Sequence, residues 1–136
     1  MTKKIRTCLY FGSFNPVHIG HTVIAGYLTE YTDIDEVWFV VSPHNPLKKK
    51  ETLLPGRDRL YMTGLAIANH YNFRTCDIEL TLPQPSYTID TLAYLREKHP
   101  GNDFALAMGE DNLYTLHKWK NAAELVKLYP IYVYRS

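Results

Sequence analysis

The chain has 136 residues, of which 46% are hydrophobic and 21% are charged, and its formal net charge is +1. This length is enough for one hydrophobic core, so we predict a single domain over residues 1–136. The composition excludes an intrinsically disordered chain. The near-neutral charge argues against a general binder of nucleic acid or of an anionic membrane.

Neither the two cysteines nor the N-terminus indicates export. Cys8 and Cys76 lie in apolar segments without a CxxC or Cys/His metal spacing, so we interpret both as buried thiols in a reducing compartment. No apolar stretch approaches the ~18 residues that are needed to cross a bilayer. The basic first residues are not followed by the apolar region of a signal peptide. We therefore expect a cytoplasmic protein without membrane contact.

Strand and helix patterns alternate along the chain. Short apolar segments predict strands over residues 7–11, 37–41, 75–80, 104–108 and 131–134. Helical patterns lie between them, over about residues 17–31, 56–70, 88–98 and 121–128. This order predicts an α/β fold with a parallel sheet. Ligands of such sheets bind beyond the carboxyl ends of the strands, so the loops after Phe11, Val41, Leu80 and Met108 are where a site is expected.

The loop after the first predicted strand has the composition of an anion-binding site. Gly12 and Ser13 allow backbone amides to approach a ligand, and the helix that follows supplies free amides and a positive dipole end. His18 and His21 are three residues apart and share one helical face, where two imidazoles can donate hydrogen bonds to phosphate oxygens. Gly20, between them, is expected to leave room for a bulky ligand.

Later loops contribute aromatic and charged side chains. Tyr87 and Trp119 could stack on a flat ring, while Thr88 begins a helix whose amides suit a carboxylate. Asp111 follows a strand, where it could accept bonds from ribose hydroxyls, and Lys48 could reach a phosphate. As alternatives, Trp119 could be a packing residue and Asp111 a helix cap.

The first residues of the second predicted helix are charged. Arg57, Asp58 and Arg59 are expected to form a solvated, salt-bridged face. Lys49 and Lys50 are likewise expected to be solvated.

Residues 12–21, GSFNPVHIGH, resemble the G-x-F-x-P-x-H-x-G-H signature of the HIGH-type nucleotidyltransferases. The resemblance implies a Rossmann-like parallel sheet with helices on both faces and ATP bound against the first helix. It implies that His18 and His21 are catalytic through contacts with the ATP phosphates. The expected ATP-binding residues are Gly12, Ser13, Phe14, His18, His21, Lys48, Gly109 and Asp111.

Three further segments are similar to one branch of that family, the nicotinate-nucleotide adenylyltransferases. Residues 42–49, SPHNPLKK, are similar to its Pro-rich loop, and residues 85–92, PSYTIDTL, to its P-S-Y-T-x-D-T-L segment. Residues 108–113, MGEDNL, followed by Trp119, resemble its G-x-D-x-L…W segment. The resemblance implies that Tyr87, Thr88 and Trp119 bind the nicotinate base and its carboxylate.

The implied reaction is adenylyl transfer from ATP to nicotinate mononucleotide, which gives nicotinate adenine dinucleotide and pyrophosphate in NAD biosynthesis. A phosphate monoester is mostly ionised near neutral pH, so we expect neither a general base nor a covalent intermediate. Magnesium is expected to arrive with ATP rather than in a cage of protein ligands. ATP and nicotinate mononucleotide are thus the expected partners, without nucleic acid.

The resemblance also points to a difference. Members of the family carry a later segment of the form S-x-T-x-[IV]-R, and the sequence stops at Tyr134-Arg135-Ser136. The expected fold is therefore C-terminally incomplete, and an edge strand left open could favour a homo-oligomer. The alternatives are a chain that binds nucleotides without turnover, and transfer to nicotinamide mononucleotide or phosphopantetheine.

Overall fold

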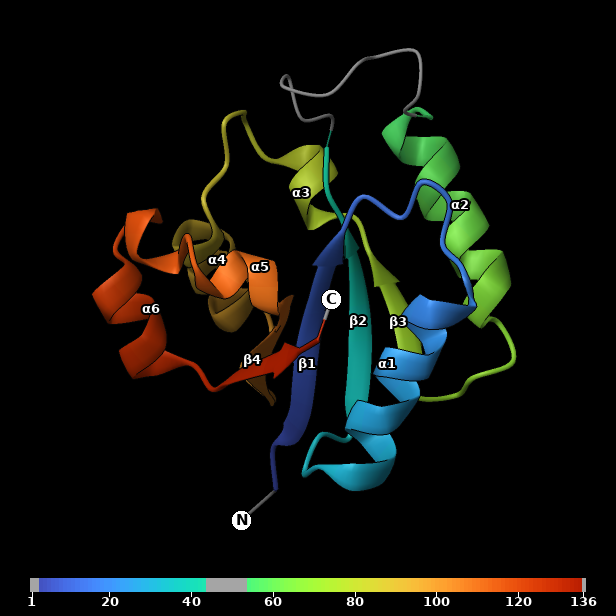
Figure 1. Cartoon of the computed structure of the whole chain (residues 1–136), viewed down its shortest axis with the longest axis horizontal. Helices are drawn as coiled ribbons and strands as arrows, with labels where there is room; N and C mark the ends of the chain where they lie inside the picture. The colour runs from blue at the N-terminus through green and yellow to red at the C-terminus, as the bar shows by residue number, and fades with distance from the viewer. Residues whose placement is uncertain (1–2, 44–53, 136) are drawn as a thin grey trace.

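The computed structural model describes residues 3–43 and 54–135. Its strands and helices alternate (Figure 1). The elements in chain order are β1 (Ile5–Gly12), α1 (Ile19–Tyr31), β2 (Glu36–Val41), α2 (Gly56–Ile67), β3 (Phe73–Cys76), α3 (Ile78–Thr81), α4 (Thr88–Lys98), β4 (Asn102–Gly109), α5 (Glu110–Leu113), the 3₁₀ helix η2 (Leu116–Lys118), α6 (Ala122–Leu128) and β5 (Ile131–Tyr134).

The strands form one five-stranded sheet in the order β3-β2-β1-β4-β5. All four neighbouring pairs are parallel. The predicted parallel α/β fold is therefore confirmed. The strand order reverses between β1 and β4, and in such sheets this switch point opens a crevice at the carboxyl ends of the strands.

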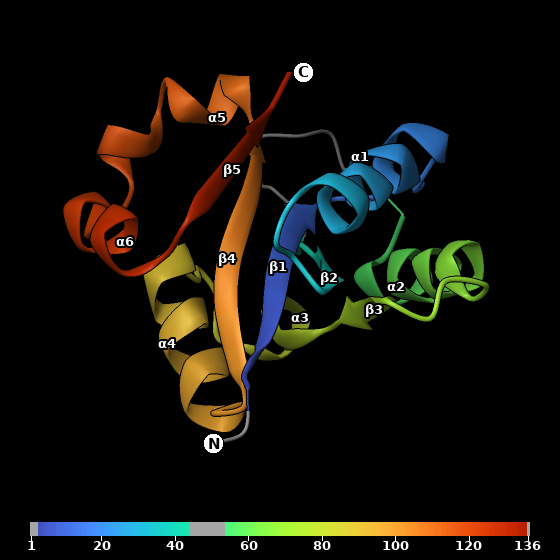
Figure 2. The ribbon, with the colours of Figure 1, turned by 90° about the horizontal axis from the view of Figure 1, so that it is seen from below.

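Helices cover both faces of the sheet, as predicted (Figure 2). On one face, α1 and α2 pack over a cluster that includes Tyr10, Ala25 and Phe39. On the other face, α4 and α6 lie over a cluster that includes Leu92 and Leu125. Because side chains alternate along a strand, neighbouring residues of β1 supply both clusters.

The predicted strand over residues 75–80 is wrong. The strand β3 ends at Cys76, and the short helix α3 follows. The segment alternates polar and apolar residues, which imitates a strand pattern. The helical turn instead buries both Ile78 and Glu79, and Glu79 obtains hydrogen-bond donors from a later segment.

Two smaller expectations also change. Helix α1 begins at Ile19 rather than near residue 17, because His18 is its N-cap. Cys8 is buried as expected, whereas Cys76 is only half-buried. None of the helices in the described part of the chain is long and apolar enough to cross a membrane. Strand β5 lies at a sheet edge, and the cytoplasmic location and self-association stay predictions.

Candidate functional site

The loop between β1 and α1 crosses the upper end of the sheet beside α2 (Figure 1). Its organising residue is Phe14, which has a left-handed backbone (φ 47°) and a side chain only 2% exposed. The ring packs edge-on against Tyr10 and His21, with centroids 5.5 and 5.0 Å away. A Cβ atom on Gly12 would lie 2.9 Å from Phe14 Cζ. Gly12 is therefore required so that the Phe14 ring can fold back beneath the loop.

His18 and His21 form a reciprocal cap at the start of α1. The His18 amide donates to Nδ1 of His21 at 2.9 Å, and the Gly20 amide donates to Nδ1 of His18 at 3.1 Å. The two rings stack with centroids 3.8 Å apart. Because each Nδ1 accepts a hydrogen bond, the neutral tautomer of each ring carries its proton on Nε2. Both histidines can thus donate Nε2–H to an anion.

The environment of His21 favours this neutral form. Burial, and then the positive charge of His18, lowers the pKa of His21 below its ordinary value. Gly20 serves these rings directly, because a Cβ there would lie 2.9 Å from Cε1 of His18. The space that was expected for a ligand is therefore filled by the His18 ring.

A cavity of about 330 Å³ opens against this loop. Its lining residues are Tyr10, Phe11, Gly12, Ser13, Phe14, Asn15, Pro16, His18, His21 and Tyr134. Five of the residues expected to bind ATP thus line one cavity. Tyr134 lies opposite Gly109 in the sheet register, and burial, with a smaller contribution from the negative charge of Asp111, raises the pKa of Tyr134. Gly109 and Asp111 do not line the cavity themselves, but both are near its lining residue Tyr134, whereas Lys48 lies outside the described residues.

Arg59 is part of this architecture, although its charged neighbours in the sequence predicted a solvated side chain. The expectation of a solvated face is wrong for Arg59, which is 1% exposed. It is confirmed for Arg57, whose exposed side chain pairs with Asp77 at 3.2 Å. A signal was present, because Arg59 lies four residues before Thr63 and eight before Ile67 on the buried stripe of α2.

The Arg59 guanidinium connects three chain segments. Nη1 donates to the carbonyl oxygens of Ser13 and Ser42, each at 2.7 Å, and Nε donates to that of Leu54 at 2.8 Å. The Ser42 amide donates to the Gly12 carbonyl at 2.9 Å. In a trans peptide the N–H points away from the C=O. The amides of Ser13 and Phe14 therefore point away from Arg59 and β2, and two such consecutive amides suit an anion.

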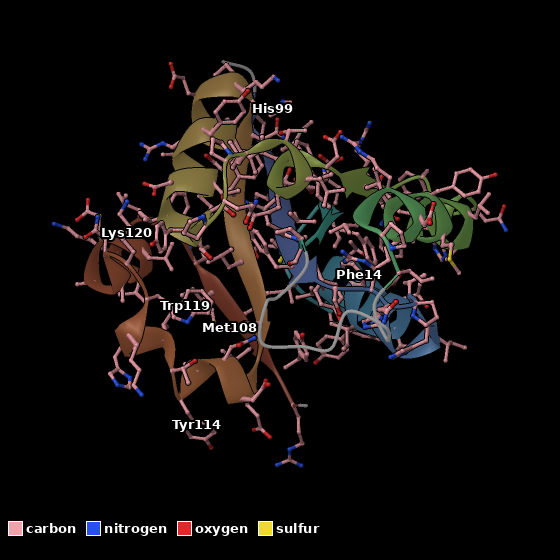
Figure 3. All side chains as sticks on the ribbon, turned by 90° about the horizontal axis from the view of Figure 1, so that it is seen from above. Phe14, His99, Met108, Tyr114, Trp119 and Lys120 are labelled. Carbon is pink, nitrogen blue, oxygen red and sulfur yellow. The ribbon has the colours of Figure 1, made fainter. Side chains whose placement is uncertain are left out.

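The segments with Tyr87 and Trp119 meet on the other face of the sheet. Tyr87 is the N-cap of α4 and makes no side-chain cap hydrogen bond, and Thr88 is the first helical residue. Trp119 is half-buried against the cluster that contains Met108, and Figure 3 shows both near the end of β4. Lys120, next to Trp119, places Nζ 4.9 Å from the centre of the Tyr87 ring. The structure thus brings these two distant segments together.

The buried carboxylate of Glu79 holds the segment around Tyr87 through hydrogen bonds. Glu79 is 7% exposed, and its Oε2 accepts hydrogen bonds from the hydroxyls of Ser86 and Thr91, each at 2.9 Å. These two residues flank Tyr87 and Thr88. In a strand over residues 75–80 Glu79 would lie on the polar face, so its burial could not be expected from that prediction.

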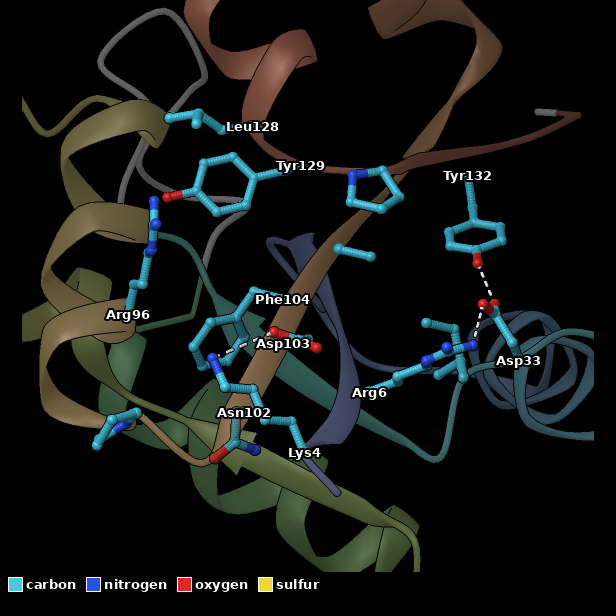
Figure 4. A pocket seen from close by; sticks show the side chains of 14 residues that line it. Lys4, Arg6, Asp33, Arg96, Asn102, Asp103, Phe104, Leu128, Tyr129 and Tyr132 are labelled. Carbon is cyan, nitrogen blue, oxygen red and sulfur yellow. Dashed lines mark hydrogen bonds and ion pairs between the residues drawn. The ribbon is translucent and has the colours of Figure 1, made fainter. Parts of the chain in front are cut away.

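A larger cavity of about 580 Å³ lies at the opposite, amino end of the strands (Figure 4). Two of its cations are neutralised, because Lys4 pairs with Asp103 at 3.7 Å and Arg6 with Asp33 at 2.6 Å. The smaller cavity lies at the carboxyl ends, where parallel sheets bind ligands. We therefore assign the site to the smaller cavity and the crevice beside it.

Comparisons with known proteins show the family and the fold of the chain. A family model described as cytidylyltransferase-like matches residues 9–136. A relative from Flavobacterium johnsoniae, named probable nicotinate-nucleotide adenylyltransferase, is 53% identical over 126 residues, which are 93% of this chain and 65% of the relative. One of the same name from Christiangramia forsetii is 51% identical over 134 residues, which are 98% of this chain and 68% of the relative. The chain thus spans about two thirds of the length of these relatives.

Solved structures share the fold. A crystal structure of a protein from Vibrio parahaemolyticus, assigned the same activity, has a TM-score of 0.78 at 21% identity. The match covers 95% of this chain and 72% of the Vibrio chain. Plasmodium falciparum nicotinic acid mononucleotide adenylyltransferase, complexed with NaAD, has a TM-score of 0.73 at 19% identity. The match covers 97% of this chain and 75% of the Plasmodium chain.

Proposed function

Because the chain belongs to the cytidylyltransferase-like family, and within it to the nicotinate-nucleotide adenylyltransferases, we propose that it transfers the adenylyl group of ATP to nicotinate mononucleotide. Residues 1–136 would act as one nucleotidyltransferase domain. The products are nicotinate adenine dinucleotide and pyrophosphate. The observation that carries this proposal is the stacked pair of His18 and His21, with both Nε2–H groups available at the edge of the cavity.

ATP is proposed to bind with its phosphates in the cavity. The Nε2–H groups of His18 and His21 donate to phosphate oxygens, and the amides of Ser13 and Phe14 support them. Each of these donors is fixed before ATP arrives, by the reciprocal cap and by Arg59. Preorganised donors stabilise developing charge without reorganising during the reaction.

The acceptor is proposed to bind on the other face of the crevice. Tyr87 and Trp119 contact the pyridine ring, and the first amides of α4, at Thr88, receive its carboxylate. The acceptor phosphate then points toward the end of β1. One of its oxygens forms a bond to the α-phosphorus of ATP while the bond to pyrophosphate breaks, and pyrophosphate leaves with the electron pair. No proton has to move, because the monoester is mostly ionised near pH 7.

Magnesium is proposed to enter as the ATP complex. Residues 3–43 and 54–135 contain no group of three or more His, Cys, Asp or Glu side chains that could hold a metal ion. Mg²⁺ often keeps phosphate oxygens and water as its ligands, so the proposed binding requires no cage of protein carboxylates. When bound, it would neutralise phosphate charge.

The direct test is product formation from Mg·ATP with nicotinate mononucleotide, nicotinamide mononucleotide and phosphopantetheine in parallel. Preferential formation of nicotinate adenine dinucleotide supports the proposal, and preference for another acceptor contradicts it. ATP binding without any product would instead indicate a nucleotide-binding chain that does not turn over.

A variant pair tests the histidine role. His18→Ala removes one donor and should lower turnover by about 10²-fold without unfolding the chain. The exposed His117, replaced by Ala, is the matched control and should leave turnover unchanged. Near-normal turnover of His18→Ala would contradict the role.

A further inference from the structure

Lys120 places a positive charge inside the proposed acceptor site. Its Nζ lies 2.8 Å from Oδ2 of Asp90 and 4.9 Å from the centre of the Tyr87 ring. Lys120 follows Trp119 directly, and Asp90 lies two residues after Thr88. The ammonium thus lies beside the Tyr87 ring, on the residue that follows Trp119, and it pairs with a carboxylate in the helical turn that Thr88 begins.

The ammonium also connects the two segments that build this site. Lys120 and Asp90 are 30 residues apart, and one follows η2 while the other lies in the first turn of α4. Figure 3 shows Lys120 and Trp119 on the same segment, and the ion pair with Asp90 joins this segment to α4. An ammonium over an aromatic face is attracted by the ring, so Lys120 also restrains Tyr87.

The local charges decide between two nearly identical acceptors. Nicotinate and nicotinamide differ in a carboxylate against a neutral amide, and their sizes are similar. Asp90 alone would repel the carboxylate, because it lies at the same helix terminus whose amides would receive that group. Lys120 neutralises Asp90 and adds an attractive charge. Both side chains are about half exposed (46% and 57%), so a ligand can reach them.

We propose that Lys120 is the specificity-determining residue that makes the acceptor site prefer an acidic pyridine mononucleotide to its neutral amide. This inference rests on the proposed function, because it uses the same acceptor site. Lys120 acts through charge, both directly on the carboxylate and by compensating Asp90. It takes no part in the transfer of the adenylyl group.

The test compares the binding of nicotinate and nicotinamide mononucleotides by calorimetry, which does not require turnover. Lys120→Gln should weaken binding of the acid about tenfold and change binding of the amide less than threefold. Lys118→Gln is the matched control, because Lys118 is exposed and forms no ion pair within the described part of the chain. It should leave both affinities unchanged.

A double variant separates charge from packing. Asp90→Asn combined with Lys120→Gln removes the repelling carboxylate as well, and should recover most of the lost affinity for the acid. Added salt should reduce the acid preference of the unaltered chain. An equal loss for both acceptors, or an unchanged ratio, would overturn the proposal.

Product formation with the same variants distinguishes the two proposals. If the unaltered chain forms the dinucleotide but Lys120→Gln keeps the acid-to-amide ratio, the function stands and the role of Lys120 is wrong. If no dinucleotide forms but Lys120→Gln loses the acid preference in binding, the inference stands and the proposed reaction fails.

Discussion

Replacing Arg59 by Met tests whether this buried cation organises the phosphate end of the site. Met fills a similar volume but donates no hydrogen bond. Arg59→Met therefore leaves the carbonyls of Ser13, Ser42 and Leu54 without the donors that Arg59 now supplies at 2.7–2.8 Å. The variant also removes a charge whose burial is unfavourable, since burial lowers the Arg59 pKa.

The lost hydrogen bonds and the removed buried charge act in opposite directions on the free energy of unfolding. A hydrogen bond from a charged donor contributes about 1.5–3 kcal/mol, so three of them contribute roughly 4–9 kcal/mol. Removing the buried charge recovers several kcal/mol of desolvation. We expect a net loss of about 3–5 kcal/mol in the free energy of unfolding, or a fall in melting temperature of roughly 10–20 °C for a chain of this size.

Equilibrium unfolding in urea measures this loss, and Arg57→Met provides the control. Arg57 is exposed, and its ion pair with Asp77 is worth at most about 1 kcal/mol. Where Arg59→Met still folds at low temperature, it should weaken ATP binding more than acceptor binding, because the Ser13 and Phe14 amides lose their orientation. A loss below about 1 kcal/mol would refute the assigned role of Arg59.

Three further predictions follow from burial and hydrogen bonding. The folded state lowers the pKa of His21 below 6.5, so the chain should lose stability as the pH falls below about 6.5. His21→Gln should reduce this dependence of the melting temperature on pH, and an unchanged dependence would contradict the pKa shift. In two-substrate kinetics, Glu79→Ala should raise the acceptor KM at least about tenfold with little effect on the ATP KM. Glu79→Gln should keep most of the activity because it retains an oxygen that accepts hydrogen bonds, and equal changes in both KM values would indicate a general packing defect. Burial raises the pKa of the Cys8 thiol to about 12, so iodoacetamide should alkylate Cys8 only after the chain is unfolded. Mass spectrometry measures the alkylation, and rapid alkylation of the folded chain would contradict the prediction.

Most of the sheet could be predicted from the sequence because four of its five strands are largely apolar segments between clear breaks, whereas β3 (Phe73–Cys76) contains Arg74 and Thr75 and was misplaced. Residues 37–41 are apolar throughout, and the structure buries all of them between the two helical layers. The loop of residues 12–21 could be predicted as well, since its motif is contiguous. Local sequence patterns are enough to predict an element when the residues that determine its structure are close together in the chain.

The buried polar residues could not be predicted in the same way. Arg59 bonds to Ser13, 46 residues away, and Glu79 bonds to Thr91, 12 residues away. A charged side chain is expected at the surface unless its partners are known. Those partners are backbone carbonyls and hydroxyls, which carry no pattern of their own, so only the folded chain reveals that Arg59 and Glu79 are internal.

The alternation of β1 explains why the two halves of the proposed site meet at one place. Tyr10 packs on the α1 face, whereas Phe11 packs on the face that carries Trp119. Side chains of one strand therefore separate the ATP side from the acceptor side until the strand ends at Gly12. Beyond Gly12 the strand has ended, and the Ser13 amide points away from β2, toward the switch point. Under the proposed function, the α-phosphorus has to lie over this amide, because it is where donors from one face and an acceptor from the other can reach the same atom.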